Sequence, residues 1–157
     1  MRLPHSLSSA AIVLLVATSP LAAQDAQSRL WDASMTGDTT AVAQALTDGA
    51  KIDSLDTRRS RNGRRALNWA ALFNKVPTVN LLIARGATVD APNLTGFTPL
   101  HHAGEAGSLE AARALLAAGA DPAFLNGVGK KPSEVAREGG HEAVAVLIGN
   151  AEKKPSP

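Results

Sequence analysis

The stretch GFTPLHHAGEAGSLEAARALLAAGADPA, residues 96–123, decides the fold that this sequence predicts. Within it, Pro99 suits the first position of a helix, and Thr98 precedes it as a helix cap. Gly107 then breaks this first helix. Residues 109–118 place leucine and alanine at three- and four-residue spacing, which gives a second helix with one apolar face. The stretch therefore predicts a unit of two short helices.

The same unit recurs along the chain at a fixed interval. Residues 63–90 (GRRALNWAALFNKVPTVNLLIARGATVD) align with residues 96–123 at an offset of 33. A further shift of 33 gives a truncated fourth unit, and the first unit aligns with the second at an offset of 37. Such a unit cannot bury its apolar face alone, whereas a stack of units can. We therefore expect one repeat domain over residues 24–150. Its repeats are expected to span residues 28–62, 63–95, 96–128 and 129–149.

The unit resembles the ankyrin repeat. The resemblance rests on the run GFTPLHHA at residues 96–103, on Gly107 and on the run Gly-Ala-Asp at residues 119–121, and it covers about residues 28–149. It implies an all-α solenoid of stacked helix pairs, with hairpin loops projecting to one side and a concave binding surface. The run Arg-Ala-Leu-Asn at residues 65–68 departs from the Thr-Pro-Leu-His that the family prefers. Such departures weaken single turns and leave the expected fold unchanged.

The N-terminus has the pattern of a secretory signal. Arg2 is followed by an apolar run at residues 10–17 and by small residues up to Ala23. The apolar run is shorter than the ~20 residues that a membrane-spanning helix needs. We expect residues 1–23 to be a signal peptide cleaved near Ala23, which would leave a periplasmic or secreted chain; an uncleaved anchor is the alternative. Residues 151–157 are expected to form a disordered tail.

The composition and the motifs give no support to catalysis. The chain has no cysteine, only 3% aromatic residues and many alanines, a composition that favours thin helices packed closely together. Its sequence contains neither a His-Glu-x-x-His pattern nor a phosphate-binding glycine loop with its lysine. The family resemblance implies that His101 is a structural residue bonded near Thr98. We therefore expect no enzyme, no cofactor and no metal.

The outward side of the first helices is the expected binding surface. Transferred position by position, the family geometry places Trp69 and Phe73 one turn apart in the middle of the concave face. We interpret them as exposed anchors of a protein interface; the alternative is that they are core residues. Trp31 falls at the inward position of His101 and is expected to be core. The other candidate contact residues on this face or at the hairpin tips are Leu72, Leu94, Phe97, His102, Glu105 and Asn126.

The second feature of the expected surface is a cluster of arginines. The extra residues between the first two repeats fall at a hairpin tip. They place five arginines within eight positions: Arg58, Arg59, Arg61, Arg64 and Arg65. The formal net charge of +2 therefore hides a basic finger on an otherwise acidic scaffold. Such a finger can steer an acidic partner, although charge runs also occur as plainly solvated loops.

Together these features favour a non-catalytic protein-binding module. We expect a monomer with an unidentified protein partner that carries an acidic patch, and no stable membrane insertion after signal cleavage. Nucleic acid is not expected as a partner, because the arginine cluster is short and lacks interleaved aromatic residues. The alternative is an anionic polymer or a lipid headgroup bound by the arginines, and a steep dependence on salt would distinguish it.

Overall fold

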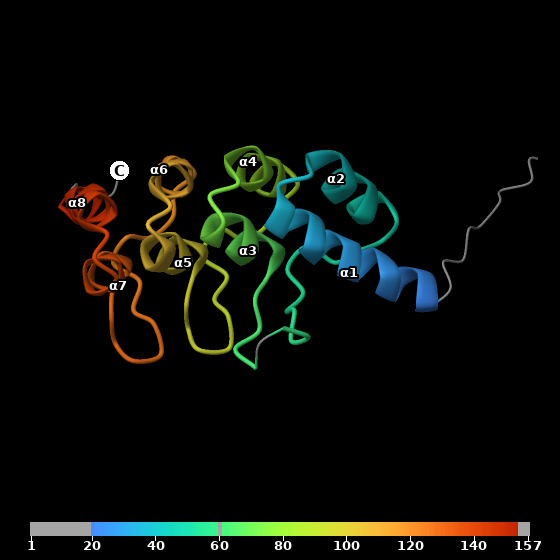
Figure 1. Cartoon of the computed structure of the whole chain (residues 1–157), viewed down its shortest axis with the longest axis horizontal. Helices are drawn as coiled ribbons and strands as arrows, with labels where there is room; N and C mark the ends of the chain where they lie inside the picture. Colours follow the sequence, from blue (N-terminus) through green and yellow to red (C-terminus); the bar gives the residue numbers. More distant parts are fainter. Residues whose placement is uncertain (1–19, 60, 154–157) are drawn as a thin grey trace, which may run out of the picture.

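Four helix pairs stack side by side in the computed structural model (Figure 1), which describes residues 20–59 and 61–153. The first helices of the pairs form one layer and the second helices form another, and each helix packs against its counterpart in the next pair. The all-helical repeat fold expected from the sequence is confirmed for these residues. The helices are α1 (Pro20–Thr36), α2 (Thr39–Thr47), α3 (Ala66–Leu72), α4 (Val76–Ala84), α5 (Pro99–Ala106), α6 (Leu109–Ala117), α7 (Pro132–Glu138) and α8 (Glu142–Glu152).

The third pair shows how the local sequence fixes each helix. Pro99 is the first residue of α5, and the Thr98 side chain accepts a hydrogen bond from the backbone N–H of His101. Gly107 ends α5 with φ +70°, a left-handed conformation that a residue with a Cβ resists. These predictions are confirmed. The His101 ring also receives the backbone N–H of Thr98 at Nδ1, so its expected structural role near Thr98 is confirmed.

The stacked pairs share a core of leucine, valine and alanine. Leu30, Leu67 and Leu100 occupy the same position in successive repeats and are buried. Trp31 is buried as predicted, and its Nε1–H donates to the Ser54 carbonyl at 3.1 Å. Because each first helix is lined with small residues, neighbouring pairs approach closely without a large core.

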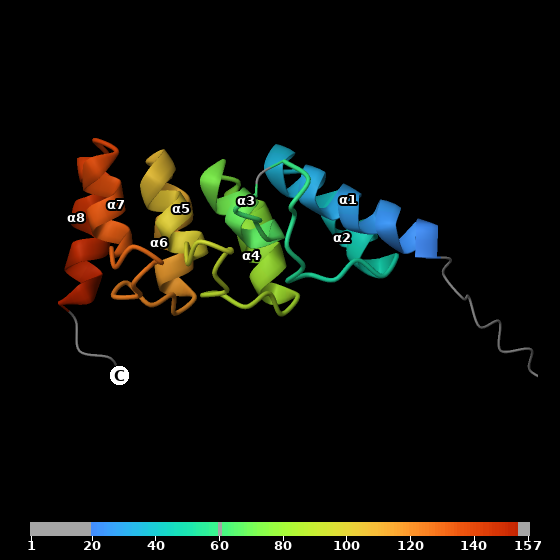
Figure 2. The ribbon, with the colours of Figure 1, turned by 90° about the horizontal axis from the view of Figure 1, so that it is seen from below.

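Each pair is joined to the next by a hairpin loop that projects away from the second-helix layer (Figures 1 and 2). At each hairpin base a backbone N–H donates to a carbonyl across the loop. These three hydrogen bonds run from Asp56 to Arg64, from Asn93 to Phe97 and from Asn126 to Lys130. The residues joined by the first bond lie eight positions apart in the sequence, whereas those joined by the other two lie four apart. The four extra residues therefore lengthen the first hairpin.

Neighbouring hairpins are joined by backbone hydrogen bonds. The Leu94 N–H donates to the Asn62 carbonyl at 2.8 Å, and one repeat later the Gly127 N–H donates to the Thr95 carbonyl at 2.9 Å. These two bonds therefore join the three hairpins into one row.

The two ends of the chain differ from the expected boundaries. Residues 1–19 of the expected signal lie outside the described residues, and α1 begins at Pro20, before the expected cleavage position. At the other end, the tail expected from residue 151 is wrong for its first two residues. Helix α8 continues through Glu152, whose carboxylate accepts from Ser133 Oγ at 2.5 Å and from Lys131 Nζ at 2.9 Å. Among the described helices, none is long and apolar enough to cross a membrane.

Candidate functional site

Trp69 is a core residue, and the prediction that it lies exposed is wrong. Its side chain is 5% exposed. The Arg64 guanidinium covers one part of the ring, with its carbon 4.7 Å from the ring centroid. Phe73 stacks on Trp69 with ring centroids 6.0 Å apart and an angle of 11° between the planes. Phe73 itself stays 48% exposed at the end of α3. Of the two aromatic residues, only Phe73 presents its ring to solvent, and Leu72 beside it is half-buried against the core.

His102 occupies the equivalent position one repeat later and is also buried, at 1% exposed, so its predicted place on the open surface is wrong. Phe97 covers it, with ring centroids 5.6 Å apart. Phe97 and Arg64 hold the same position at the bases of successive hairpins, and each covers the outward side chain of the helix that follows. Glu105 remains exposed and accepts a hydrogen bond from His102 Nδ1 at 2.9 Å.

In their neutral forms, the two adjacent histidines carry their protons on opposite ring nitrogens. His101 Nε2 lies 2.9 Å from the Lys130 carbonyl, which can only accept, so Nε2 holds the proton and Nδ1 receives the Thr98 N–H. His102 Nδ1 faces the Glu105 carboxylate, so Nδ1 holds the proton and Nε2 faces the Asn93 amide at 3.4 Å. The pKa of both histidines is lowered, mainly because burial removes water from around the charged form of the ring. A second proton on either ring would remove an acceptor.

We expect acid to destabilise the fold through these two rings. Because their pKa values in the folded chain lie below the ordinary 6.5, the unfolded chain binds more protons as the pH falls. Their contribution to stability is therefore present in full above that value and is lost as the pH falls through the lowered pKa values. Urea unfolding at about pH 7.5 and about pH 5.5 measures it. The double variant His101→Asn, His102→Gln is expected to show a flatter dependence. A wild-type free energy of unfolding that does not change between these pH values would contradict the assignment.

Asn126 holds the third hairpin together and does not contact solvent as a tip residue, so this prediction is wrong. It is buried, and its Oδ1 accepts the backbone N–H groups of Val128 and Lys130 at 3.1 and 3.0 Å. Asn93 does the same one repeat earlier, where it accepts the N–H groups of Thr95 and Phe97. The offset of 33 between two asparagines, which favour such turns, was the signal that could have identified this role.

The second and third hairpins expose large apolar side chains. Leu94 is exposed as predicted. Sequence reasoning missed Leu125 and Val128, which flank Asn126 on the third hairpin and are both exposed. Isolated apolar residues in a predicted loop carry no signal of their own, which is why the repeat alignment alone could not single them out.

The arginines of the first hairpin are mostly engaged within the molecule. Arg58 pairs with Asp56, donating from Nε to Oδ1 at 2.9 Å. Burial alone would raise the pKa of the Asp56 carboxyl, but the hydrogen bonds from Arg58 outweigh it and the pKa is lowered. Arg65 donates to the backbone carbonyls of Asp53 and Pro92. With Arg64 placed over Trp69, three of the five arginines are structural.

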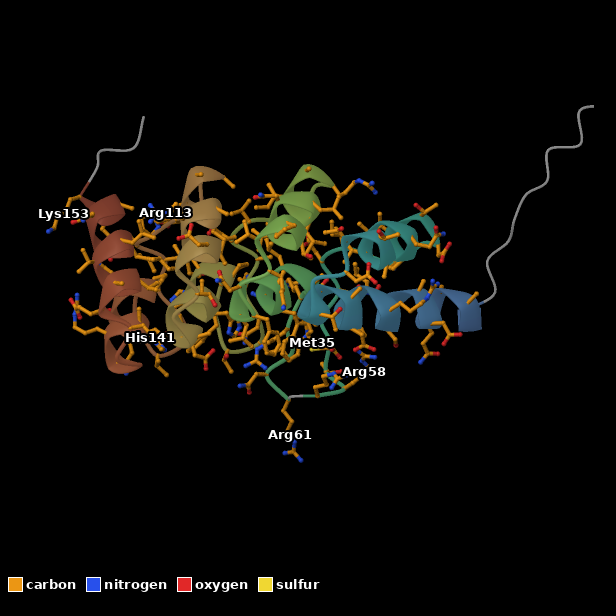
Figure 3. All side chains as sticks on the ribbon, turned by 45° about the horizontal axis from the view of Figure 1, so that its top comes forward. Met35, Arg58, Arg61, Arg113, His141 and Lys153 are labelled. Carbon is orange, nitrogen blue, oxygen red and sulfur yellow. The ribbon has the colours of Figure 1, made fainter. Side chains whose placement is uncertain are left out.

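Arg59 and Arg61 are exposed on the first hairpin, as is the outer part of Arg58, whose side chain is 36% exposed. Arg59 Nη2 donates to Asp32 on α1 at 3.2 Å. Arg61 is exposed, and Figure 3 shows it extended away from the ribbon at the end of the hairpin, while Arg58 lies back beside α1. The sequence-predicted finger therefore exists, but its freely accessible charge is smaller than the number of arginines suggests.

No three His, Asp or Glu side chains within residues 20–59 and 61–153 gather as metal ligands. A hollow of about 340 Å³ lies between α7 and α8 at the C-terminal end of the stack. Its wall includes Lys131, Ser133 and Glu152, which already bond to one another, and none of the predicted contact residues lines it.

Comparison with known proteins agrees with the helix pairs and their hairpins. The family model for ankyrin repeats, in three copies, matches residues 30–126. The chain belongs to the ankyrin-repeat family. Ankyrin repeats generally mediate protein–protein interaction, and the family is typically a non-catalytic interaction module.

The curated relatives are ankyrin-repeat proteins, and the first two are much longer than this chain. The chain is 31% identical over 134 residues to the tyrosine-protein kinase Shark of Drosophila melanogaster, covering 85% of this chain and 14% of the kinase. It is 35% identical over 121 residues to the B-cell lymphoma 3 protein homolog of Mus musculus, covering 77% of this chain and 26% of that protein. Protein phosphatase 1 regulatory subunit 27 of Mus musculus is 39% identical over 86 residues, which is 55% of each chain. The chain therefore spans only part of these relatives, and their whole-protein activities do not transfer to it.

Proposed function

We propose that this ankyrin-repeat chain is an exported, non-catalytic module that binds a protein partner through its hairpin row and the exposed ends of its first helices. The family supplies the general activity, because ankyrin repeats mediate protein–protein interaction. The distribution of exposed apolar side chains supports the choice of surface.

That distribution is the observation that carries the proposal. Among the described residues, five large apolar side chains are exposed, and four of them belong to this surface: Phe73, Leu94, Leu125 and Val128. The fifth, Val146, lies on the second helix of the last pair. Exposed apolar groups that gather on one side of a small protein are typical of an interaction site, because burying them on binding is favourable.

Export is proposed from the sequence of residues 1–23. Ala26 is buried in the stack, and Gln27 exchanges two hydrogen bonds with the Lys51 backbone. Both residues follow the expected cleavage position, so cleavage would leave these contacts in the mature chain. N-terminal sequencing of the chain recovered outside the cytoplasm tests this. A mature protein that begins at Gln24 supports export, and recovery of the intact chain from the cytoplasm alone contradicts it.

An anionic polymer or lipid headgroup is a weaker candidate than a protein. Four of the five arginines that would bind it already have partners or ring contacts within the molecule. Three exposed arginines, two of them paired with Asp32, are few for a surface that would hold a polyanion through charge alone, since such binding rests on many simultaneous phosphate contacts.

A capture experiment on the exposed apolar residues tests the proposed surface. The wild-type chain and the double variant Phe73→Ala, Leu94→Ala are immobilised and exposed to an extract of the compartment in which the chain resides. We expect a specific protein to be retained by the wild type and reduced at least about tenfold by the double variant, since central apolar anchors dominate interface energies.

The matched control is Val146→Ala. Val146 is 49% exposed, nearly the same as Phe73, but lies on the second-helix layer. The control is expected to retain the partner at the wild-type level, and circular dichroism should show equal helicity for all three proteins. Equal retention by the double variant would rule out the proposed surface, and the absence of any specifically retained protein would contradict the proposed function.

A further inference from the structure

The first hairpin holds one guanidinium in a fixed position. Asp56 is completely buried and binds Arg58 through both of its oxygens and at the backbone N–H of Arg58. The guanidinium carbon of Arg58 also lies 4.8 Å from the centroid of the Trp31 ring. A guanidinium anchored on a buried carboxylate and an indole ring loses little conformational freedom when it binds a further group.

A single exposed carboxylate bridges this fixed arginine to its neighbour. Asp32 on α1 accepts from Arg58 Nη2 at 3.0 Å and from Arg59 Nη2 at 3.2 Å, and both bonds reach the same oxygen, Oδ1. The Asp32 side chain is 47% exposed and that of Arg59 is 55% exposed. Exposed ion pairs of this kind are weak in water. They can therefore be exchanged for a carboxylate from outside.

The charge around the bridge is unbalanced. The charge of Arg58 is balanced by buried Asp56, and the single charge of Asp32 is shared between Arg58 and Arg59. Arg61 extends beyond them (Figure 3). Asp32 sits at the outward first-helix position of the first repeat, the position that Trp69 and His102 occupy in the next two repeats. The carboxylate thus stands on the proposed binding side, in contact with the arginines that would meet a partner.

We infer that the first hairpin is a carboxylate-binding site for an acidic segment of the protein partner, and that Asp32 occupies this site in the free chain. On binding, a partner carboxylate replaces Asp32 on Arg58 and Arg59, and Arg61 meets a second acidic residue. This inference rests on the proposed function, whose partner it describes as acidic. A guanidinium donates two parallel N–H bonds to the two oxygens of one carboxylate, which favours acidic side chains as the occupant.

A substitution of Asp32 tests the inference, because it is expected to strengthen binding rather than weaken it. Removing an acidic residue that is part of an ordinary interface weakens binding or leaves it unchanged. Removing a residue that competes with the ligand strengthens binding. We expect Asp32→Asn to bind poly-L-glutamate about three- to tenfold more tightly than its control, the range that corresponds to the loss of one or two exposed ion pairs.

The control is Asp48→Asn. Asp48 pairs with Arg29 at 2.7 Å through exposed side chains, at the end of α2 and away from the first hairpin. Both variants change the net charge equally, so long-range steering is the same and the difference between them reports the local site. The double variant Arg59→Gln, Arg61→Gln is expected to weaken binding of the same probe. Titrations on the full chain at low and at physiological salt give the affinities.

Asp32→Asn binding no more tightly than Asp48→Asn would overturn the inference, as would tighter binding of polyphosphate or of anionic phospholipid vesicles than of poly-L-glutamate. Neither result would bear on the capture by Phe73 and Leu94, because that experiment leaves the first hairpin unchanged. The proposed function and the carboxylate site can therefore fail separately.

Discussion

Replacing Trp69 with alanine is expected to lower the free energy of unfolding by about 3–5 kcal/mol, the usual cost of truncating a buried tryptophan. The Arg64 guanidinium covers the ring and Phe73 stacks on it, and its removal would leave a cavity between the base of the first hairpin and α3. Urea unfolding followed by far-ultraviolet circular dichroism measures the change, and the loss of Trp69 leaves Trp31 as the fluorophore of the first repeat.

Phe73→Ala is the control for this prediction. Phe73 stacks on the same ring but is half exposed, so its truncation is expected to cost about 1 kcal/mol, mainly through the lost ring contact. A small effect of Trp69→Ala, equal to that of Phe73→Ala, would mean that Trp69 does not belong to the core. The pair of variants also separates stability from binding, because only Phe73 offers surface to a partner.

The contrast between Trp69 and Trp31 shows how far the sequence could predict the site. The repeat offsets placed both residues on the correct helices, and the inward position of Trp31 was predicted correctly. The outward position was harder, because Asp32, Trp69 and His102 share it and differ in exposure. Their burial depends on whether a hairpin-base side chain folds over them, as Arg64 covers Trp69. That contact joins different parts of a repeat, and no local pattern reports it.

The same limit applies to the arginines. Counting charges along the chain identified the first hairpin as basic, but it could not identify the partners of each guanidinium. Asp32 on α1 and the Pro92 carbonyl that Arg65 reaches are brought to the hairpin only by folding. By contrast, features set by neighbouring residues were predictable, such as the cap at Thr98 and the glycine that ends α5.

The second large effect is expected at Gly96, in the second hairpin. Gly96 has φ +81°, and a Cβ added there would lie 2.5 Å from the backbone nitrogen of Gly127. That nitrogen donates to the Thr95 carbonyl and joins the second hairpin to the third. Gly96→Ala therefore combines the cost of a left-handed alanine with the separation of two hairpins. We expect it to lower the free energy of unfolding by about 3–4 kcal/mol in total.

Gly129 is the matched control, because it holds the same position one repeat later. It has φ +75°, so alanine is strained there too, but no atom lies within 4 Å of the added Cβ. Gly129→Ala is expected to cost only the conformational part, about 1–2 kcal/mol. The difference between the two variants in urea unfolding measures what the contact between hairpins contributes. Equal losses would show that the hairpins are not held against one another and that their tips do not form a fixed row. A larger loss of stability for Gly96→Ala means that the hairpins hold their exposed residues in position before a partner binds. Binding then costs less conformational entropy of the loops.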